Sequence, residues 1–257
     1  MKKLISLLLV AAVIFSLGAC SGKNNKETDG NTPVSTEPYS LKIVRDKKFY
    51  KEFKTEDGKV TYVIDAVMPE VFGCNEAVCD SVNSVFETII SEAEMLAKVN
   101  IEHAANYMES FGTDKPWTRK ITYEIKFCNA KYLCLMLTDD APLTSDPELV
   151  ARTFNLETGN IVSLSELETD GVQGLDPETK EAIKFDIISQ AENLAGAPLT
   201  QEQMKKLEKA FDFSNFWFNE FQFAVVVPMV LIDDAFYGKG HIECRYFLAD
   251  YNMQIAE

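Results

Sequence analysis

The residue of this chain with the most clearly specified chemistry is Cys20, which ends the tetrad Leu17-Gly18-Ala19-Cys20. Lys2 and Lys3 precede an apolar run, Leu4 to Leu17, that carries no charged residue. A basic start, an apolar run too short to span a bilayer permanently and small residues before a cysteine are typical of a bacterial lipoprotein signal peptide. We therefore expect cleavage before Cys20 and a diacylglycerol on its thiol, which would anchor the protein to an extracytoplasmic membrane surface, of the cell membrane or an outer membrane. The alternative is an ordinary secretory signal with a chance cysteine.

Catalytic groups are scarce downstream of this cysteine. His103 and His241 are the only histidines, and neither belongs to a metalloprotease, nucleophile-elbow or phosphate-loop motif. The carboxylate pairs Asp139-Asp140 and Asp233-Asp234 could act as acid and base or hold calcium, but adjacent acids in turns are usually solvated loop residues. We therefore expect no enzyme activity, no metal and no cofactor.

The five cysteines after Cys20 cannot all pair within the chain. Cys128 and Cys134 lie on neighbouring parts of a predicted hairpin in positions that disfavour a disulfide. Cys74 and Cys79 form the better pair, although the spacing of four intervening residues is a weak signal. Our default expectation for all five cysteines is nevertheless buried or free thiols, and whether Cys74 and Cys79 form a disulfide stays open.

The charge of the chain is strongly negative, with a formal net charge of −15. Removing residues 1–19 takes away two lysines and no acid, which makes the charge −17. This acidity argues against binding to nucleic acid or to anionic lipid and favours a cationic partner. The alternative is that the charge only keeps the protein soluble.

Four segments are predicted from composition and pattern. Residues 1–19 form the signal peptide, and residues 20–38 form a disordered tether because they are poor in aliphatic side chains. Residues 39–117 form an N-terminal strand-helix subdomain, and residues 118–257 form a C-terminal α+β subdomain.

Alternating strand and helix patterns predict an α+β fold with mostly antiparallel sheets. One long amphipathic helix is expected in the first half, beginning after Asn75 and ending at Gly112, and two helices in the second, beginning after Asp176 and Thr200. The strand candidates are Leu41–Phe53, Val60–Met68, Tyr123–Phe127, Leu133–Leu137, Val150–Phe154, Ile161–Leu164, Phe221–Ile232 and His241–Leu248.

Seven aromatic residues crowd the segment from Phe211 to Phe223, among them Trp217. A cluster of this kind either packs into the core or forms a surface on which sugars stack. The core interpretation is favoured because long apolar runs are usually buried, and an exposed Trp217 would favour the binding interpretation.

The segment Thr153-Phe154-Asn155-Leu156-Glu157-Thr158-Gly159-Asn160-Ile161-Val162-Ser163-Leu164-Ser165-Glu166-Leu167 resembles a signature of the extracytoplasmic domain of RsiV-like, lysozyme-sensing anti-sigma factors. Residues 62–86 are similar to a companion domain found beside some peptidoglycan deacetylases. The family's histidine-glycine motif is replaced here by Thr144-Ser145-Asp146-Pro147. We expect no anti-sigma activity, because only a signal peptide precedes Cys20.

The resemblance implies a cell-envelope binding or sensing module for a cationic protein such as lysozyme, or for cell-wall glycan. Two loops, Thr138–Glu148 and Asp233–Gly240, would contact the partner. The alternatives are an accessory protein or a hydrolase or deacetylase acting on peptidoglycan, and a structural envelope lipoprotein. The candidate binding residues are Asp139, Asp140, Asp233, Asp234, Tyr237 and Trp217.

Overall fold

The computed structural model describes residues 42–144, 146–169, 172–173, 176–210, 213–233 and 240–251. The chain divides into two compact units, Met1–Thr36 and Glu37–Glu257, and every described residue belongs to the second. The predicted signal peptide, the lipidation site Cys20 and the tether lie outside the described residues. Among the described residues, no helix is long and apolar enough to cross a membrane.

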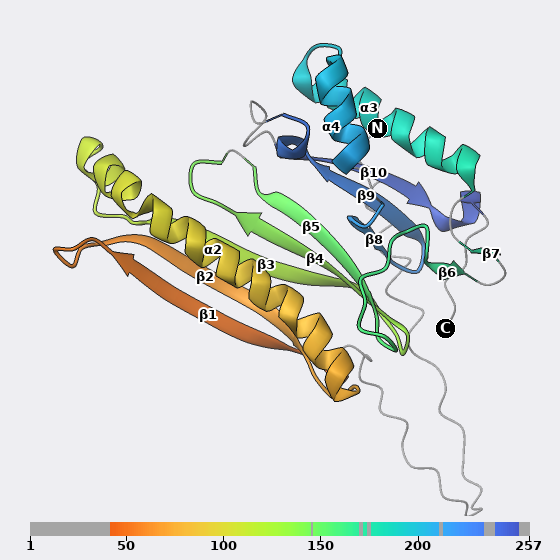
Figure 1. The fold of residues 1–257 in the computed structure, drawn as a ribbon, viewed down its shortest axis with the longest axis horizontal. Coiled ribbons are helices and arrows are strands. Elements are labelled where there is room, and N and C mark those ends of the chain that lie inside the picture. The colour runs from red at the N-terminus through yellow and green to blue at the C-terminus, as the bar shows by residue number, and fades with distance from the viewer. Residues whose placement is uncertain are drawn as a thin grey trace, which may run out of the picture. The chain divides into compact units, whose positions relative to one another are not determined.

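The first half of the described chain builds a five-stranded sheet with strand order β1-β2-β3-β4-β5 (Figure 1). Neighbouring strands are antiparallel except β2 and β3, which are parallel. A parallel pair needs a long crossover, and a helix, α2 (Glu76–Ser110), supplies it. The strands are β1 (Val44–Lys54), β2 (Val60–Val71), β3 (Trp117–Cys128), β4 (Tyr132–Asp140) and β5 (Glu148–Asn155).

The helix α2 begins as predicted, because the side chain of Asn75 accepts a hydrogen bond from the backbone N–H of Ala77. Its buried face follows a heptad spacing and uses small side chains where the helix lies against the sheet. Leu96 falls outside that face and is exposed. The buried residues of this face include Val82, Phe86, Ala93, Ala97, Ala104 and Met108.

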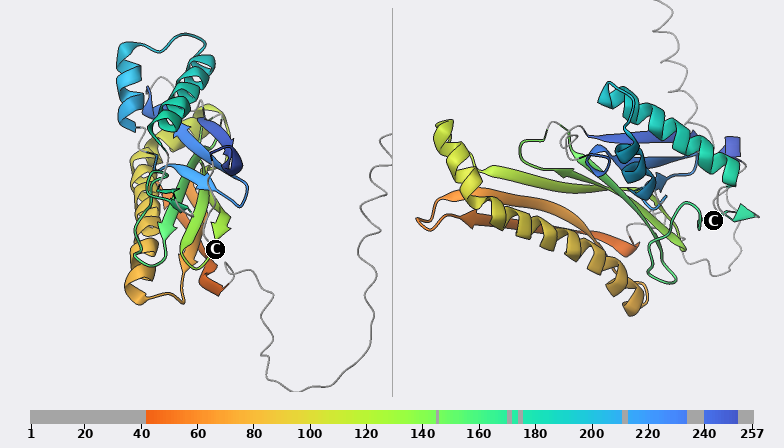
Figure 2. Two further views of the ribbon diagram at one scale, coloured as in Figure 1. Left: turned by 90° about the vertical axis from the view of Figure 1, so that its right-hand side faces the viewer. Right: turned by 45° about the horizontal axis from the view of Figure 1, so that its top comes forward.

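The second half builds a three-stranded antiparallel sheet with strand order β10-β9-β8. Its strands are β8 (Phe216–Phe218), β9 (Gln222–Pro228) and β10 (His241–Phe247). The helices α3 (Pro177–Ala195) and α4 (Gln201–Ala210) lie on the side of this sheet that faces away from β4 and β5 (Figures 1 and 2). The shorter elements are β6 (Glu168–Thr169), β7 (Val172–Gln173), η1 (Met229–Leu231) and η3 (Leu248–Tyr251).

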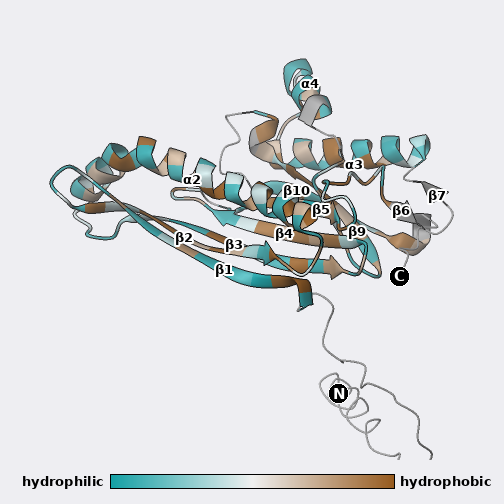
Figure 3. Ribbon diagram, turned by 60° about the horizontal axis from the view of Figure 1, so that its bottom comes forward, coloured by the Kyte–Doolittle hydropathy of each residue, from teal (hydrophilic) through white to brown (hydrophobic). Residues whose placement is uncertain are grey.

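Strand β4 joins the two halves because its opposite faces belong to different hydrophobic cores. Leu133, Leu135 and Leu137 pack into the core beneath α2, whereas Tyr132 and Cys134 pack into the core shared with the second sheet. Strand β1, at one edge of the large sheet, is largely hydrophilic (Figure 3). The predicted α+β class with one early and two later helices is confirmed.

The predicted subdomain boundary between residues 117 and 118 lies at the start of β3. Because β3 pairs with β2, strands from both predicted subdomains share one sheet. The predicted hairpin around residues 157–160 is reduced to a single bridge between Phe154 and Ile161, since β5 pairs with β4 instead.

The turn that carries the family resemblance is held against α2. The side chain of Asn155 accepts hydrogen bonds from the backbone N–H groups of Glu157 and Thr158, as the sequence predicts. Gly159 has φ of 77°, and a Cβ atom there would lie 2.8 Å from Cβ of Ser81 on α2. Glycine is therefore required twice, by the backbone conformation and by the close contact with the helix.

Candidate functional site

The first predicted binding residue, Asp139, is used inside the fold. It lies on β4, and its Oδ1 accepts a hydrogen bond of 2.8 Å from Nε of Arg119 on the neighbouring strand β3. A second hydrogen bond joins the same two side chains, and both are mostly buried. Although burial opposes it, the hydrogen bond with Asp139 raises the pKa of Arg119. The carboxylate of Asp139 therefore links β3 to β4, and both of its oxygens already accept hydrogen bonds within the fold.

Asp140 and the loop that follows it are exposed to solvent. Asp146 and Glu148 are also exposed, so three carboxylates surround this loop. Desolvation and the nearby carboxylate of Asp139 raise the pKa of Glu148. Among the described residues, none forms a hydrogen bond or an ion pair with the side chain of Asp140, which leaves its charge available at the surface.

The structure brings the two predicted contact loops together. A Cβ atom on Gly240 would lie 3.1 Å from Cβ of Asp146, so the start of β10 contacts the loop between β4 and β5. The carbonyl oxygen of Gly240 accepts a hydrogen bond from the N–H of Met229, which ties this point to η1. Gly240, the last residue of the second predicted loop, thus lies beside Asp146 of the first, although the two are about ninety residues apart in the chain.

Asp233 is half-buried at the end of η1, where its Oδ2 accepts a hydrogen bond of 2.8 Å from Nε2 of Gln203. The same Gln203 side chain caps α4 by accepting from the N–H of Thr200, as the predicted capping box requires. Asp234 and Tyr237, the other candidates in this loop, lie outside the described residues.

Trp217 lies in the core and not at a binding surface, so the core interpretation of the aromatic segment holds. Only 3% of its surface is exposed, and its Nε1 donates a hydrogen bond of 2.8 Å to Glu243. The cations of Lys126 and Arg245 lie 4.9 and 5.6 Å from its ring. Most of the segment is buried with it, whereas Phe221 is exposed and Phe211 lies outside the described residues.

The cysteines correct one expectation. Cys74 and Cys79 form a disulfide across the start of α2, with Cα atoms 6.0 Å apart. Cys128, Cys134 and Cys244 are thiols, and desolvation raises the pKa of each to about 11. Such thiols are protonated near neutral pH and make poor nucleophiles.

The two histidines lie in different surroundings. His103 is exposed on α2, and Nδ1 of His241 is buried without a hydrogen-bond partner. Within the described ranges, no group of His, Cys, Asp and Glu side chains could hold a metal ion.

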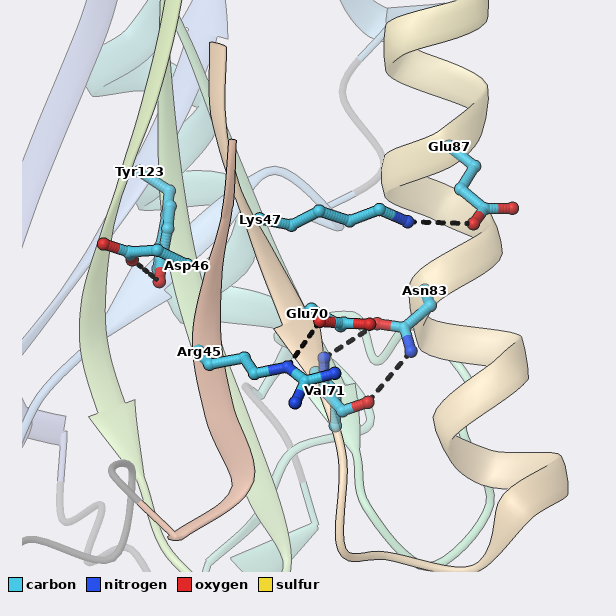
Figure 4. Close-up of polar contacts among 8 residues, drawn as sticks. All are labelled: Arg45, Asp46, Lys47, Glu70, Val71, Asn83, Glu87 and Tyr123. Atoms are coloured by element: carbon cyan, nitrogen blue, oxygen red, sulfur yellow. Dashed lines mark hydrogen bonds and ion pairs between the residues drawn. The ribbon is translucent and has the colours of Figure 1, made fainter. Parts of the chain in front are cut away.

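A groove that the sequence did not predict lies between α2 and the hairpin of β1 and β2, with a volume of about 720 Å³ (Figure 4). Lys47 reaches across it, with Nζ 3.4 Å from Oε1 of Glu87 on α2. Beside it, Nε of Arg45 lies 2.5 Å from Oε2 of Glu70. The sequence could not predict this groove, because its walls come from segments that are distant in the chain and meet only in the folded protein. They include Lys48, Phe49, Met68, Asp80, Phe86 and Ile90.

The groove is held in place by Asn83, whose side chain bonds both the N–H and the C=O of Val71 at 2.8 and 2.9 Å. On the other side of β1, Asp46 accepts a hydrogen bond of 2.7 Å from the hydroxyl of Tyr123. Charged groups around the groove thus largely pair with one another, so it offers no excess of either charge to a partner.

Comparisons with known proteins add a likeness of fold. A crystal structure of a DUF3298 family member from Bacteroides fragilis NCTC 9343 has a TM-score of 0.46 and 10% identity, and the match covers 83% of this chain and 93% of that chain. A DUF3298 family protein from Pseudomonas aeruginosa PAO1 has a TM-score of 0.43 and 10% identity, with 83% and 94% covered. Likeness at this level carries no argument about the site. No protein-family model and no curated protein matches the sequence, so the RsiV-like resemblance stays a prediction.

Proposed function

We propose that this protein is a non-catalytic binding module of the cell envelope, anchored through lipid on Cys20. Its partner is a cationic protein such as lysozyme, which it captures through the acidic loops Thr138–Glu148 and Asp233–Gly240. The signal-peptide pattern before Cys20 supports the location, and the family resemblance of residues 153–167 supports the class of partner.

The observation that carries this proposal is the contact between Asp146 and Gly240. It brings Gly240, at the end of the second predicted loop, against the segment where Asp140 and Glu148 are also exposed. Lysozymes are cationic, so an acidic surface would speed their association and strengthen the complex. The net charge of −15 adds to the attraction at long range.

Titration of the purified full chain with lysozyme tests the proposal. We expect saturable binding in 50 mM salt that weakens in 300 mM salt, because ions screen charged surfaces. The double variant Asp140→Asn, Glu148→Gln should bind more weakly. The matched control, Glu56→Gln with Glu92→Gln, removes the same charge from exposed positions on the β1–β2 turn and on α2 and should bind like the natural protein. No binding, or equal loss in both double variants, would contradict the proposed surface.

A further inference from the structure

Strand β1 has one edge that no described strand covers. The large sheet has the order β1-β2-β3-β4-β5, and within the described residues β1 pairs only with β2 (Figure 1). The strand is 11 residues long and contains no proline, so its outer edge presents backbone N–H and C=O groups to which another strand can bond. Proteins often protect such an edge with charged side chains, so the arrangement of charges on β1 decides what can pair there.

The charges on the two faces of β1 are balanced in different ways. Alternate side chains of a strand point to opposite faces of the sheet. On the face toward α2, each of the three cations forms an ion pair with a glutamate of β2 or α2. These pairs are Arg45–Glu70, Lys47–Glu87 and Lys51–Glu94. The other face carries two acids and two cations, all exposed, whose charges sum to zero: Asp46, Lys48, Glu52 and Lys54.

The sequence of β1 is complementary to itself in one antiparallel register. When two copies of β1 pair about a two-fold axis at Tyr50, Lys48 lies opposite Glu52 of the second copy. In the same register, Asp46 lies opposite Lys54 of the second copy, and no two like charges are directly opposite. Moving the axis by one or two residues in either direction places lysine opposite lysine or acid opposite acid, which is destabilising.

This pairing also covers part of the groove between α2 and β1. The register places Lys51 of the second copy opposite Phe49, which is half-buried and lines the groove, so the lysine stem can pack on the ring. The helix α2 is fastened to β2 through Asn83. In the joined sheet, the β2 strands of the two copies are three strand spacings apart, about 14 Å. That exceeds the separation of about 8–10 Å between packed helices, so both copies of α2 fit on one face of the sheet.

We propose that β1 of one copy pairs with β1 of a second copy, antiparallel about Tyr50, and joins the two five-stranded sheets into one sheet of ten strands. The acidic loop Thr138–Glu148 connects β4 and β5 at the other end of the strand order, so the dimer leaves it open. The inference goes beyond the proposed function, because pairing through β1 requires no cationic partner. Dimerisation and lysozyme capture therefore fail or succeed independently.

Oxidative cross-linking of the purified full chain tests the register. Opposed Cα atoms of an antiparallel pair lie about 4.5–5.5 Å apart, within the range of a disulfide. Tyr50 is 64% exposed, and Tyr50→Cys should yield a covalent dimer when a mild oxidant such as diamide is added. Lys48→Cys is the matched control, because the two copies of residue 48 would lie four positions apart along the strands, or about 13 Å. It should give no more covalent dimer than the natural protein.

Sedimentation of the same chain measures the strength of the dimer. Lys48→Glu and Glu52→Lys each place like charges opposite one another twice, by symmetry, and should raise the dissociation constant at least about tenfold. The double variant restores opposite charges and should dimerise like the natural protein. Lys59→Glu is the control, because it makes the same change of charge at an exposed position in the turn between β1 and β2.

Three results would overturn the inference. They are a chain that stays monomeric at every concentration, equal loss of dimer in Lys48→Glu and Lys59→Glu, and equal cross-linking of Lys48→Cys and Tyr50→Cys. The substituted side chains are all exposed, so the variants should fold, and circular dichroism checks that they do.

Discussion

The two tryptophans of this chain lie in regions that use their side chains in opposite ways. Around Trp217, the indole N–H has a carboxylate partner, two cations lie near the ring, and Phe216 and Phe218 are fully buried. Around Trp117, the indole N–H has no partner within the described residues, and the neighbouring Phe111 is exposed. The aromatic segment around Trp217 is therefore part of the core, whereas the smaller aromatic group around Trp117 leaves ring surface exposed.

The largest expected difference between the two regions is in their contribution to stability. Phe218→Ala should lower the free energy of unfolding by about 3–5 kcal/mol, because it leaves a cavity among buried rings. Phe111→Ala should change the free energy of unfolding by no more than about 0.5 kcal/mol, because the ring is mostly in water. Urea unfolding followed by circular dichroism measures both. Similar losses in the two variants would break the comparison.

The next contrast concerns the indole nitrogens. Trp217→Phe removes a hydrogen bond to the carboxylate of Glu243 and should cost about 1.5–3 kcal/mol of unfolding free energy. Trp117→Phe removes the same ring volume but a donor that has no partner among the described residues, so it should lower the free energy of unfolding less than Trp217→Phe does. Urea unfolding of the two variants checks this order. A larger loss from Trp117→Phe would show that its N–H is satisfied in solution.

A third contrast compares a side chain that bonds the backbone inside the fold with a side chain that forms only an exposed ion pair. Asn83→Ala leaves the N–H and C=O of Val71 without their side-chain partner and should cost about 1–3 kcal/mol of unfolding free energy. Lys47→Ala removes only an exposed ion pair beside the same groove and should cost at most about 1 kcal/mol. Thermal unfolding of both variants tests the order, which a larger effect of Lys47→Ala would reverse.

The smallest expected effect depends on pH and sharpens the contrast between Asp139, which is paired, and Glu148, whose side chain is exposed at the surface but whose carboxylate is partly desolvated. Since desolvation and Asp139 raise the pKa of Glu148, the folded protein holds a proton there more tightly than the unfolded chain. Stability from this group is therefore present below its ordinary pKa and is lost as pH rises through the folded value.

Glu148→Gln should accordingly be more stable than the natural protein at pH 7 and lose that advantage near about pH 4, close to the ordinary pKa of Glu. Urea midpoints at the two pH values measure the difference, with Glu56→Gln as the exposed control. A variant less stable than the natural protein at pH 7 would contradict the assigned environment of Glu148.

The sequence predicted those parts of the fold that depend on local chemistry. Asn75 caps α2, Asp176 caps α3 and Gly196 ends it in a left-handed conformation, because each effect needs only neighbouring residues. The contact of Gly159 with Ser81 was not predicted, because the two residues are distant in the chain.

The parts that the sequence did not predict depend on partners distant in the chain. Strand β3 pairs with β2 in parallel because α2 brings the chain back to the same end of the sheet. No local sequence pattern encodes that return. Cys74 and Cys79 were recognised as the better pair, yet free thiols were expected. At the candidate site, Asp139 and Asp140 were expected in a loop but lie at the end of β4, and the pairing of Asp139 with Arg119 needed the register of β3 and β4.

Hydrogen exchange of the purified full chain, with and without saturating lysozyme in low salt, tests the central claim most directly, because it reports where a partner covers the backbone. The account predicts slower exchange in Thr138–Glu148 and around Gly240, with no change at the end of α2 near Phe111. Unchanged exchange in both loops, or protection confined to α2, would contradict capture of a cationic protein by the acidic loops.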